Sequence, residues 1–346
     1  MSEQPEGFDE ESIWGHALRH KISMKDESVR QLLFALSEGD PSCLDQAQPE
    51  TMNNFLRVLC GLLRKEAWMQ AEVAATFAGI CGMDASKLTA VVDKDWFVIA
   101  ILRMLREPPE AEVFVQMVKT LRDVVAHATS KPEAVAWLCT QAVTELCLAM
   151  VTDPFNPLSL ALIDLLMTAA MELGPVALRS FVKLATGHEN ARYFGETLIR
   201  IMNEAELDTD HPPPTGYKPA VMVLGFMHAS SDSADFLYPA DQRILLDVLL
   251  RHMGGIAHTA ANAETWMAWI QAVSGIVLNS KQYRDGDLHK GKEIIDALRM
   301  LREELPEGAV PNYSAVCSMF SLSLEPCHPF AGINPGSVYV THILPL

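Results

Sequence analysis

Two pairs of side chains in the sequence are of types that bind transition metals. His16 and His20 are spaced i, i+4, so a helix would place both imidazoles on one face, as half of a zinc site requires. Cys327 and His328 stand next to each other in a proline-rich stretch. Neither pair has a third or fourth ligand nearby in the sequence. We therefore interpret them as ordinary polar residues and expect no metal ion.

Motifs that hold cofactors or activate nucleophiles do not occur in the 346 residues, which contain no G-x-G-x-x-G, P-loop, G-x-S-x-G or H-E-x-x-H. The many carboxylates fall where helix faces and turns are expected, and solvation accounts for them there. We therefore expect no cofactor and no enzymatic activity. An enzyme with a site of another pattern stays open as an alternative.

The residues that could bind a macromolecule lie between positions 235 and 304. In the segment DQRILLDVLLRH, Arg243, Asp247 and Arg251 recur at every fourth position, while the positions between them are mostly apolar. On a helix they form one narrow polar stripe. The stripe is either a set of ion pairs within the helix or a surface that is presented to a partner. The sequence leaves both interpretations open.

The next segment, 281–302, carries an excess of basic residues in a chain whose formal net charge is −17. Its charged residues are Lys281, Arg284, Lys290, Lys292, Arg299 and Arg302 against Asp285, Asp287, Glu293 and Asp296. An apolar stripe runs through Ile294, Ile295, Leu298 and Leu301, which leaves Lys292, Asp296 and Arg299 to face outward. A solvated face of mixed charge is one interpretation, and the local excess of basic charge favours an acidic protein partner as the other.

Helical periodicity dominates the elements that must position these residues, and it predicts an all-α chain. A representative apolar stripe consists of Phe114, Met117, Val118, Leu121, Val124 and Val125. Prolines such as Pro157, Pro175 and Pro239 stand where helices should begin. The predicted helices, about fifteen in number, cover roughly 10–22, 27–38, 50–64, 66–81, 84–91, 95–106, 110–128, 132–151, 157–173, 175–186, 190–204, 218–229, 239–253, 262–279 and 287–304.

So many helices with short links predict an armadillo- or HEAT-like helical solenoid, an elongated single array with a period of about 40 residues. We place an acidic tail at 1–8, the solenoid at 9–304 with a loop at 205–217, and a proline-rich tail at 305–346 that packs on or near the last layer. The tryptophans inside apolar runs are expected to pack in the core; these are Trp68, Trp96, Trp137, Trp266 and Trp269.

Charge and composition exclude several classes of function. A net charge of −17 argues against a protein that binds nucleic acid or an anionic membrane. The longest apolar runs, such as 220–227, are far shorter than the ~18–20 residues that span a bilayer. Seven cysteines, an odd number without a C-x-x-C pair, indicate reduced thiols in a cytosolic protein. We expect a monomer or a weak dimer.

A resemblance to a known family rests on the stretch from FLYPADQRILLDVLLR to IIDALRML. The matching positions are Tyr238, Pro239, Asp241, Asp247, Arg251, Leu278, Asn279 and Tyr283. In these residues the chain resembles the WISH/DIP/SPIN family, whose leucine-rich armadillo domains activate the actin-related protein 2/3 complex. The chain departs from the family pattern at His252 and Met253, which are followed by two glycines where the pattern continues the helix.

The resemblance implies a cytoplasmic protein of cortical actin patches that binds the actin-related protein 2/3 complex, and through it actin, without a preformed filament. The activated complex then seeds linear filaments. Residues 305–346 contain only Glu307 and Glu325 as acids, so this tail is not the acidic tail of the branching activators. The predicted partner-binding residues are Arg243, Asp247, Arg251, Lys281, Tyr283, Arg284 and Lys290. The alternative is a passive armadillo scaffold, although apart from Asn279 no asparagine recurs at a fixed interval as in peptide-binding arrays.

Overall fold

The computed structural model describes residues 50, 54–57, 59, 105, 111–127, 135–207, 213–214, 216–229, 231–256, 262–286 and 289–304. Several predictions fall outside these residues. They are the tails at 1–8 and 305–346, the helices at 10–22, 27–38, 66–81 and 84–91, most of the helix at 50–64, the helix at 95–106 except residue 105, and residues His16, His20, Trp68, Trp96, Cys327 and His328.

Helices are the only regular secondary structure in the described ranges, which confirms the all-α prediction there. In chain order they are α8 (Ala111–His127), η1 (Ala136–Cys139), α10 (Gln141–Ala149), α11 (Pro157–Glu172), α12 (Pro175–Gly187), α13 (Ala191–Glu204), α14 (Tyr217–Met227), α15 (Ser231–Ala234), α16 (Pro239–His252), η2 (Met253–Gly255), α17 (Ala263–Asn279), α18 (Lys281–Arg284) and α19 (Gly291–Glu304).

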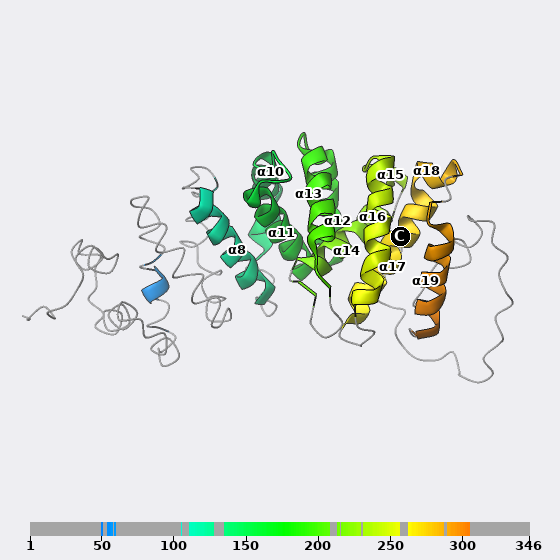
Figure 1. Ribbon diagram of the computed structural model, residues 1–346. Helices are drawn as coiled ribbons and strands as arrows, with labels where there is room; N and C mark the ends of the chain where they lie inside the picture. The colour runs from blue at the N-terminus through cyan, green and yellow to red at the C-terminus, as the bar shows by residue number, and fades with distance from the viewer. Residues whose placement is uncertain are drawn as a thin grey trace, which may run out of the picture.

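The helices stack in one direction, from α8 to α19, and form two rows (Figure 1). Helices α8, α11, α14 and α17 make the first row, in which each contacts the next, and α13, α16 and α19 make the second row in the same way. A short helix, a second-row helix and a first-row helix follow one another along the chain, as in α15, α16 and α17. Layers of this kind are typical of armadillo-like arrays. The predicted solenoid is therefore confirmed for the described part of the chain.

Unequal short helices explain why the sequence shows no sharp repeat. Helix α12 has 13 residues, whereas α15 and α18 have four residues each. The first-row helices therefore begin at uneven intervals, at Ala111, Pro157, Tyr217 and Ala263. A layer needs only a matching apolar face, so its length along the chain is free to vary.

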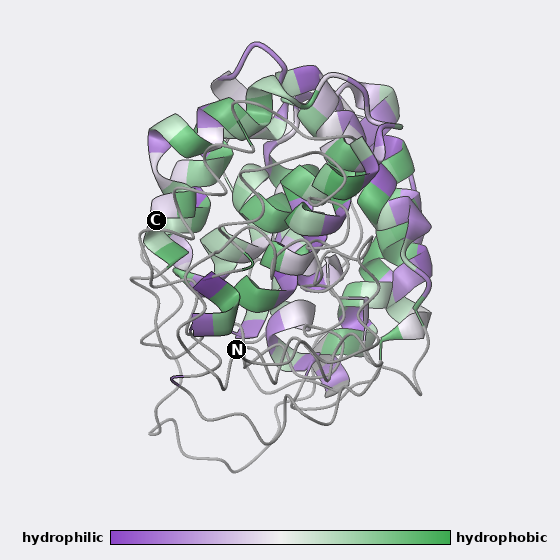
Figure 2. Cartoon of the chain, turned by 90° about the vertical axis from the view of Figure 1, so that its left-hand side faces the viewer, coloured by the Kyte–Doolittle hydropathy of each residue, from purple (hydrophilic) through white to green (hydrophobic). Residues whose placement is uncertain are grey.

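Apolar side chains fill the space between the rows, and hydrophilic residues lie on the periphery (Figure 2). Helix α17 is buried on nearly all sides, because it lies between α14 and the second row. Its Trp266 and Trp269 are fully buried and meet edge to face, with ring centroids 5.9 Å apart. The indole N–H of Trp269 donates to the carbonyl of Leu249 at 2.8 Å. The predicted core role of these two tryptophans is confirmed, and Trp137 is half-buried.

Helix starts follow the predicted chemistry. Pro157, Pro175 and Pro239 open α11, α12 and α16, where a missing backbone N–H leaves no bond unmade. The side chain of Asn156 caps α11 by accepting the Leu158 N–H at 2.9 Å.

The single helix predicted over 132–151 is wrong, because the chain breaks at Thr140. This residue has extended backbone angles, and its hydroxyl donates to the carbonyl of Trp137 at 2.8 Å, which competes with a continuing helix. The helix predicted from 287 begins only at Gly291, because Gly286 and Lys290 have positive φ angles of 98° and 57°. The four-residue helices α15 and α18 were not predicted.

Two further properties of the described residues concern thiols and membranes. Cys139 and Cys147 are free, and burial raises the pKa of the Cys147 thiol to about 12, which keeps it unreactive. No helix in the described part of the chain is both long and apolar enough to cross a bilayer.

Candidate partner-binding face

Helix α16 turns a broad exposed face to solvent. Arg243, Asp247 and Arg251 are all exposed, and the residues on the other side of the helix are buried, namely Leu245, Leu246, Val248 and Leu249. Ile244 was predicted to be part of the packed apolar surface, yet it is 49% exposed beside Arg243. The stripe is therefore wider than expected and includes an apolar side chain.

Arg251 joins α16 to the second-row helix before it. Its Nη2 donates to both the backbone carbonyl and the Oδ1 of Asn203, each at 3.2 Å. Asn203 lies in the last turn of α13 and was not among the predicted residues. The contact leaves Arg251 exposed, so its other guanidinium N–H groups face solvent.

Asp247 joins α16 to the turn that precedes α19. Its Oδ1 lies 3.0 Å from Nε2 of His289, which stands in the turn before α19. One exposed stripe on α16 thus contacts α13 on one side and the turn before α19 on the other. The contacts of Asp247 and Arg251 reach beyond their own helix. The stripe therefore links α16 to neighbouring elements, which an ion pair within the helix would not do.

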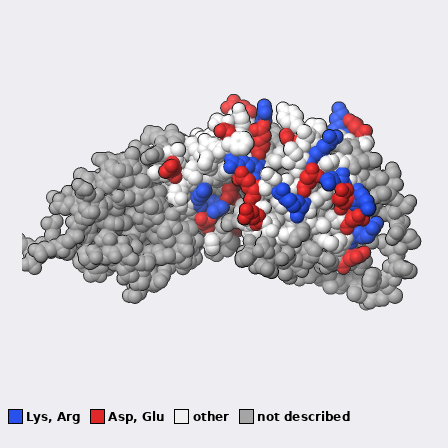
Figure 3. Space-filling model, in the orientation of Figure 1, with Lys and Arg blue, Asp and Glu red and all other residues white. Residues whose placement is uncertain are grey.

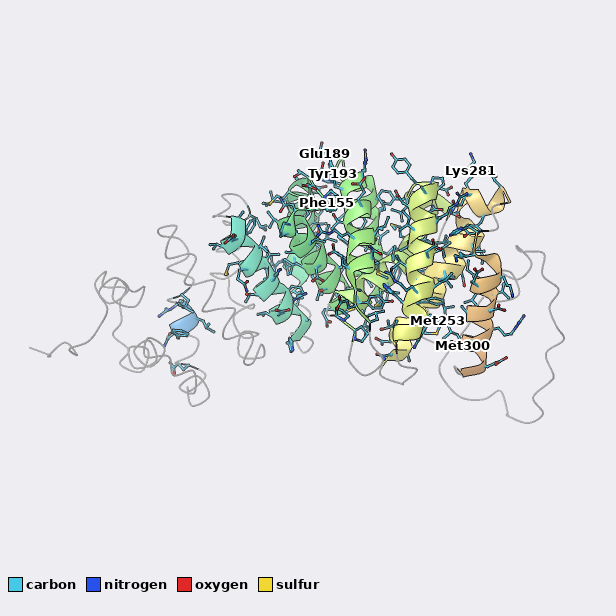
Figure 4. The ribbon with its side chains drawn as sticks, in the orientation of Figure 1. Phe155, Glu189, Tyr193, Met253, Lys281 and Met300 are labelled. Carbon is cyan, nitrogen blue, oxygen red and sulfur yellow. The ribbon has the colours of Figure 1, made fainter. Side chains whose placement is uncertain are left out.

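Asp235, the residue after α15, organises the basic end of the face. Its Oδ1 accepts the backbone N–H of Lys281 at 2.6 Å, and its Oδ2 lies 3.5 Å from Nη2 of Arg284. Lys281 is exposed at the start of α18, and its side chain lies near the upper right of the array in Figure 4. The carboxylate therefore fixes the start of α18 and holds Arg284 beside Lys281.

Tyr283 has a different place from the one expected for a partner-binding residue. It is only 3% exposed, and its hydroxyl donates to the carbonyl of His289 at 2.8 Å. Because the ring packs into the core, Tyr283 does not reach a partner directly. It holds the turn between α18 and α19, and so it positions His289 opposite Asp247.

The last helix of the face has the predicted orientation. Ile294, Ile295, Leu298 and Leu301 of α19 are buried, whereas Lys292 and Asp296 are exposed. Arg299 is half-buried and lies 3.5 Å from Asp296. Lys290, exposed before the helix, lies 3.4 Å from Glu293.

Asn279 and His228 hold the corner behind this face. The Asn279 side chain donates to the backbone carbonyl of His228 at 2.7 Å. His228 is fully buried at the end of α14, and its Nδ1 lies 3.0 Å from the carbonyl of Leu224. Burial lowers the pKa of His228 to about 4, so the ring is neutral at physiological pH.

Basic and acidic side chains alternate over the face formed by α13, α16 and α19 (Figure 3). On α13 the pairs Arg192–Glu196 and Arg200–Glu204 are spaced i, i+4, with N–O distances of 2.7 and 2.6 Å. Among the described residues, no group of three or more His, Cys, Asp or Glu is arranged to hold a metal ion.

No family model matches the sequence, and no curated protein matches it. Among solved structures, a designed armadillo repeat protein is 13% identical with a TM-score of 0.44, and the match covers 77% of this chain and 99% of that chain. A second one, in complex with the peptide (KR)4, is 10% identical with a TM-score of 0.40 and the same coverage. An engineered protein is 16% identical with a TM-score of 0.42, over 77% and 96% of the two chains. These likenesses carry no conclusion about function, and the fold follows from the layers of this chain itself.

Proposed function

We propose that this protein activates the actin-related protein 2/3 complex by binding it through the exposed face of α16, α18 and α19. The chain would then act in the cytoplasm, at cortical actin, and would nucleate linear filaments without a preformed filament. The proposal starts from the resemblance of residues 235–304 to the WISH/DIP/SPIN family. It describes a protein that works by binding and not by catalysis.

One observation carries the proposal most directly. The exposed residues Asp247 and Arg251 each contact a neighbouring element, His289 before α19 and Asn203 on α13. A surface that is linked in this way keeps its shape when it meets a partner. Little conformational entropy is then lost on binding, because the side chains are already held in place.

A stiff surface suits activation by selection of one conformation. The actin-related protein 2/3 complex would need to be bound more tightly in its active arrangement than in its resting one, because only such a difference moves the equilibrium between the two. A flexible surface would adapt to both arrangements of the complex and bind them about equally, so it would not shift the equilibrium between them.

The charge of the proposed face indicates what it would bind. Arg251 on α16, Lys281 and Arg284 on α18, and Lys292 on α19 are exposed in a chain that is acidic overall. An acidic region on the complex would meet them, and Ile244 would add an apolar contact at the centre. Tyr283 of α18 has a positioning role in this proposal, because its ring is buried.

The test is actin polymerisation with the purified complex and no preformed filaments. The chain is expected to shorten the lag, and microscopy of the product is expected to show linear filaments. Arg251→Glu and Lys281→Glu should each weaken activation at least tenfold, as charge reversal in an interface commonly does. Lys183→Glu, which reverses an exposed charge on α12 outside the face, is the matched control and should activate as the unaltered chain does.

Two results would contradict the proposal. Absence of any acceleration by the unaltered chain would exclude the function. Full activation by Arg251→Glu and Lys281→Glu, with the helical circular dichroism retained, would exclude the face. A passive scaffold, the alternative, predicts binding of a protein partner with no effect on the lag.

A further inference from the structure

Phe155 is an exposed aromatic residue in the turn between α10 and α11. Its side chain is 74% exposed, and among the described residues only three other large apolar side chains are exposed, namely Val176, Tyr238 and Ile244. A single exposed apolar residue is common on protein surfaces and by itself indicates nothing. The surroundings of Phe155 set it apart from Val176.

The backbone on both sides of Phe155 is fixed by local hydrogen bonds. The Phe155 N–H donates to Oδ1 of Asp153 at 2.8 Å, and the Asn156 N–H donates to the Asp153 carbonyl at 3.1 Å. Asn156 in turn caps α11, so the turn leads directly into a first-row helix. The position of the Phe155 backbone is therefore set by the turn and by the helix that follows.

The ring itself is held from the neighbouring layer. The guanidinium carbon of Arg200, on α13, lies 5.1 Å from the centroid of the Phe155 ring. The same Arg200 donates through Nη1 to the carbonyl of Pro154 at 2.9 Å, and through Nε to Glu204 at 2.6 Å. One side chain thus fixes the ring and the residue before it, and the far side of the ring stays open to solvent.

An exposed aromatic ring that is already ordered is the kind of group that dominates binding energy. It offers a large apolar area, and little side-chain freedom remains to be lost when it is buried by a partner. Glu204 offsets the charge of Arg200, and the exposed Asp153 accepts the Phe155 N–H, so one carboxylate is in excess beside Phe155. Figure 4 labels Phe155 near the upper part of α13, the helix that carries Arg200.

We infer that Phe155 is an anchor that inserts into an apolar pocket with a basic rim on the protein partner. This inference rests on the proposed function, because the partner is taken to be the actin-related protein 2/3 complex. The face would then have an aromatic anchor beside α13, where Arg192 and Arg200 are paired with Glu196 and Glu204, and a basic end at α18. A partner with a pocket for the ring at one end and acidic groups at the other could bind in only one orientation.

The experiment measures the equilibrium affinity of the full chain for the purified complex by biolayer interferometry. Phe155→Ala is expected to weaken binding about tenfold or more, as truncation of an anchor does. Arg200→Gln, which keeps the ring but removes the guanidinium over it, is expected to weaken binding by a smaller factor. Val176→Ala removes an apolar side chain of about the same exposure on α12, and it should change the affinity less than about twofold.

The outcomes separate the inference from the proposed function. If the unaltered chain does not bind the complex, both are overturned. If it binds and Arg251→Glu weakens binding, while Phe155→Ala binds as Val176→Ala does, the anchor alone is overturned. Because Phe155 is mostly exposed, its replacement leaves the core intact, and an unchanged thermal midpoint of Phe155→Ala verifies this.

Discussion

The side-chain amide of Asn279 on α17 donates a 2.7 Å hydrogen bond to the backbone carbonyl of His228 at the end of α14. The two helices approach closely there at Gly275. A Cβ atom at this position would lie only 2.5 Å from the same carbonyl oxygen of His228, so a larger residue would not fit. The contact joins two first-row helices directly behind the candidate face. The position of α18 and its basic residues therefore depends on it.

Replacing Asn279 with alanine should lower the free energy of unfolding by about 1–2 kcal/mol, because the His228 carbonyl would lose its side-chain donor. Urea denaturation followed by circular dichroism measures this. Gln271→Ala, at an exposed position of the same helix, is the control and should stay within about 0.5 kcal/mol of the unaltered chain. Equal stabilities of the two variants would show that the hydrogen bond contributes nothing.

Replacing Gly275 with alanine should lower the free energy of unfolding by about 1–3 kcal/mol, because the added methyl group would push α17 away from α14. Nothing lies within 4 Å of a Cβ atom at Gly187, so Gly187→Ala provides a matched control that should be neutral or slightly stabilising. Thermal unfolding of both variants compares them. A Gly275→Ala variant as stable as Gly187→Ala would mean that the two helices separate at no cost.

Replacing Tyr283 with phenylalanine should lower the free energy of unfolding by about 1 kcal/mol. The ring would remain in the core, but the bond from its hydroxyl to the His289 carbonyl would be lost. Amide hydrogen exchange should become faster at Ile294, whose N–H donates to the Lys290 carbonyl at 2.9 Å, because the first turn of α19 would open more often. Unchanged exchange there would argue that Tyr283 does not position the turn.

The stability of the fold should depend on pH through His228. Burial depresses the pKa of this imidazole to about 4, whereas an unfolded histidine has its ordinary value near 6.5. As the pH falls from 6.5 toward 4, the unfolded chain binds a proton that the folded chain excludes, so stability is lost over this window. The full effect is about 3 kcal/mol.

Replacing His228 with leucine should remove this contribution, so that the variant loses less stability than the unaltered chain between pH 7 and pH 5. Denaturant unfolding at the two pH values gives the comparison. Burial raises the pKa values of Asp164 and Glu172, which acts in the opposite direction in both chains and cancels in the difference. His127→Gln, at an exposed position on α8, is the control. An equal pH dependence in the leucine variant would refute the role of His228.

Apolar spacing in the sequence was sufficient to predict the long helices and the outward orientation of Arg243, Asp247 and Arg251. Those features depend on residues that are close together in the chain, so local periodicity carries them. The four-residue helices α15 and α18 are too short to show a period. The burial of Tyr283 could not be predicted either. It depends on the turn at Gly286 and Lys290, which apolar spacing does not show.

Contacts between layers were beyond prediction from one sequence. Asn203 meets Arg251 across 48 positions, His289 meets Asp247 across 42, and His228 meets Asn279 across 51. Each pair is defined only once the layers are stacked. The cation–π contact of Arg200 with Phe155 is another contact of this kind, because it joins α13 to the turn before α11.

Both rows of helices are joined mainly by buried apolar side chains. Charge pairs at the surface add further links, such as Lys218–Glu264 between α14 and α17 and Arg284–Asp235 beside α18. Dissolved salt screens charge pairs that are in contact with water and leaves apolar packing almost unaffected. A rise in ionic strength would therefore weaken the links at the outer surface of the array while its apolar interior stays packed.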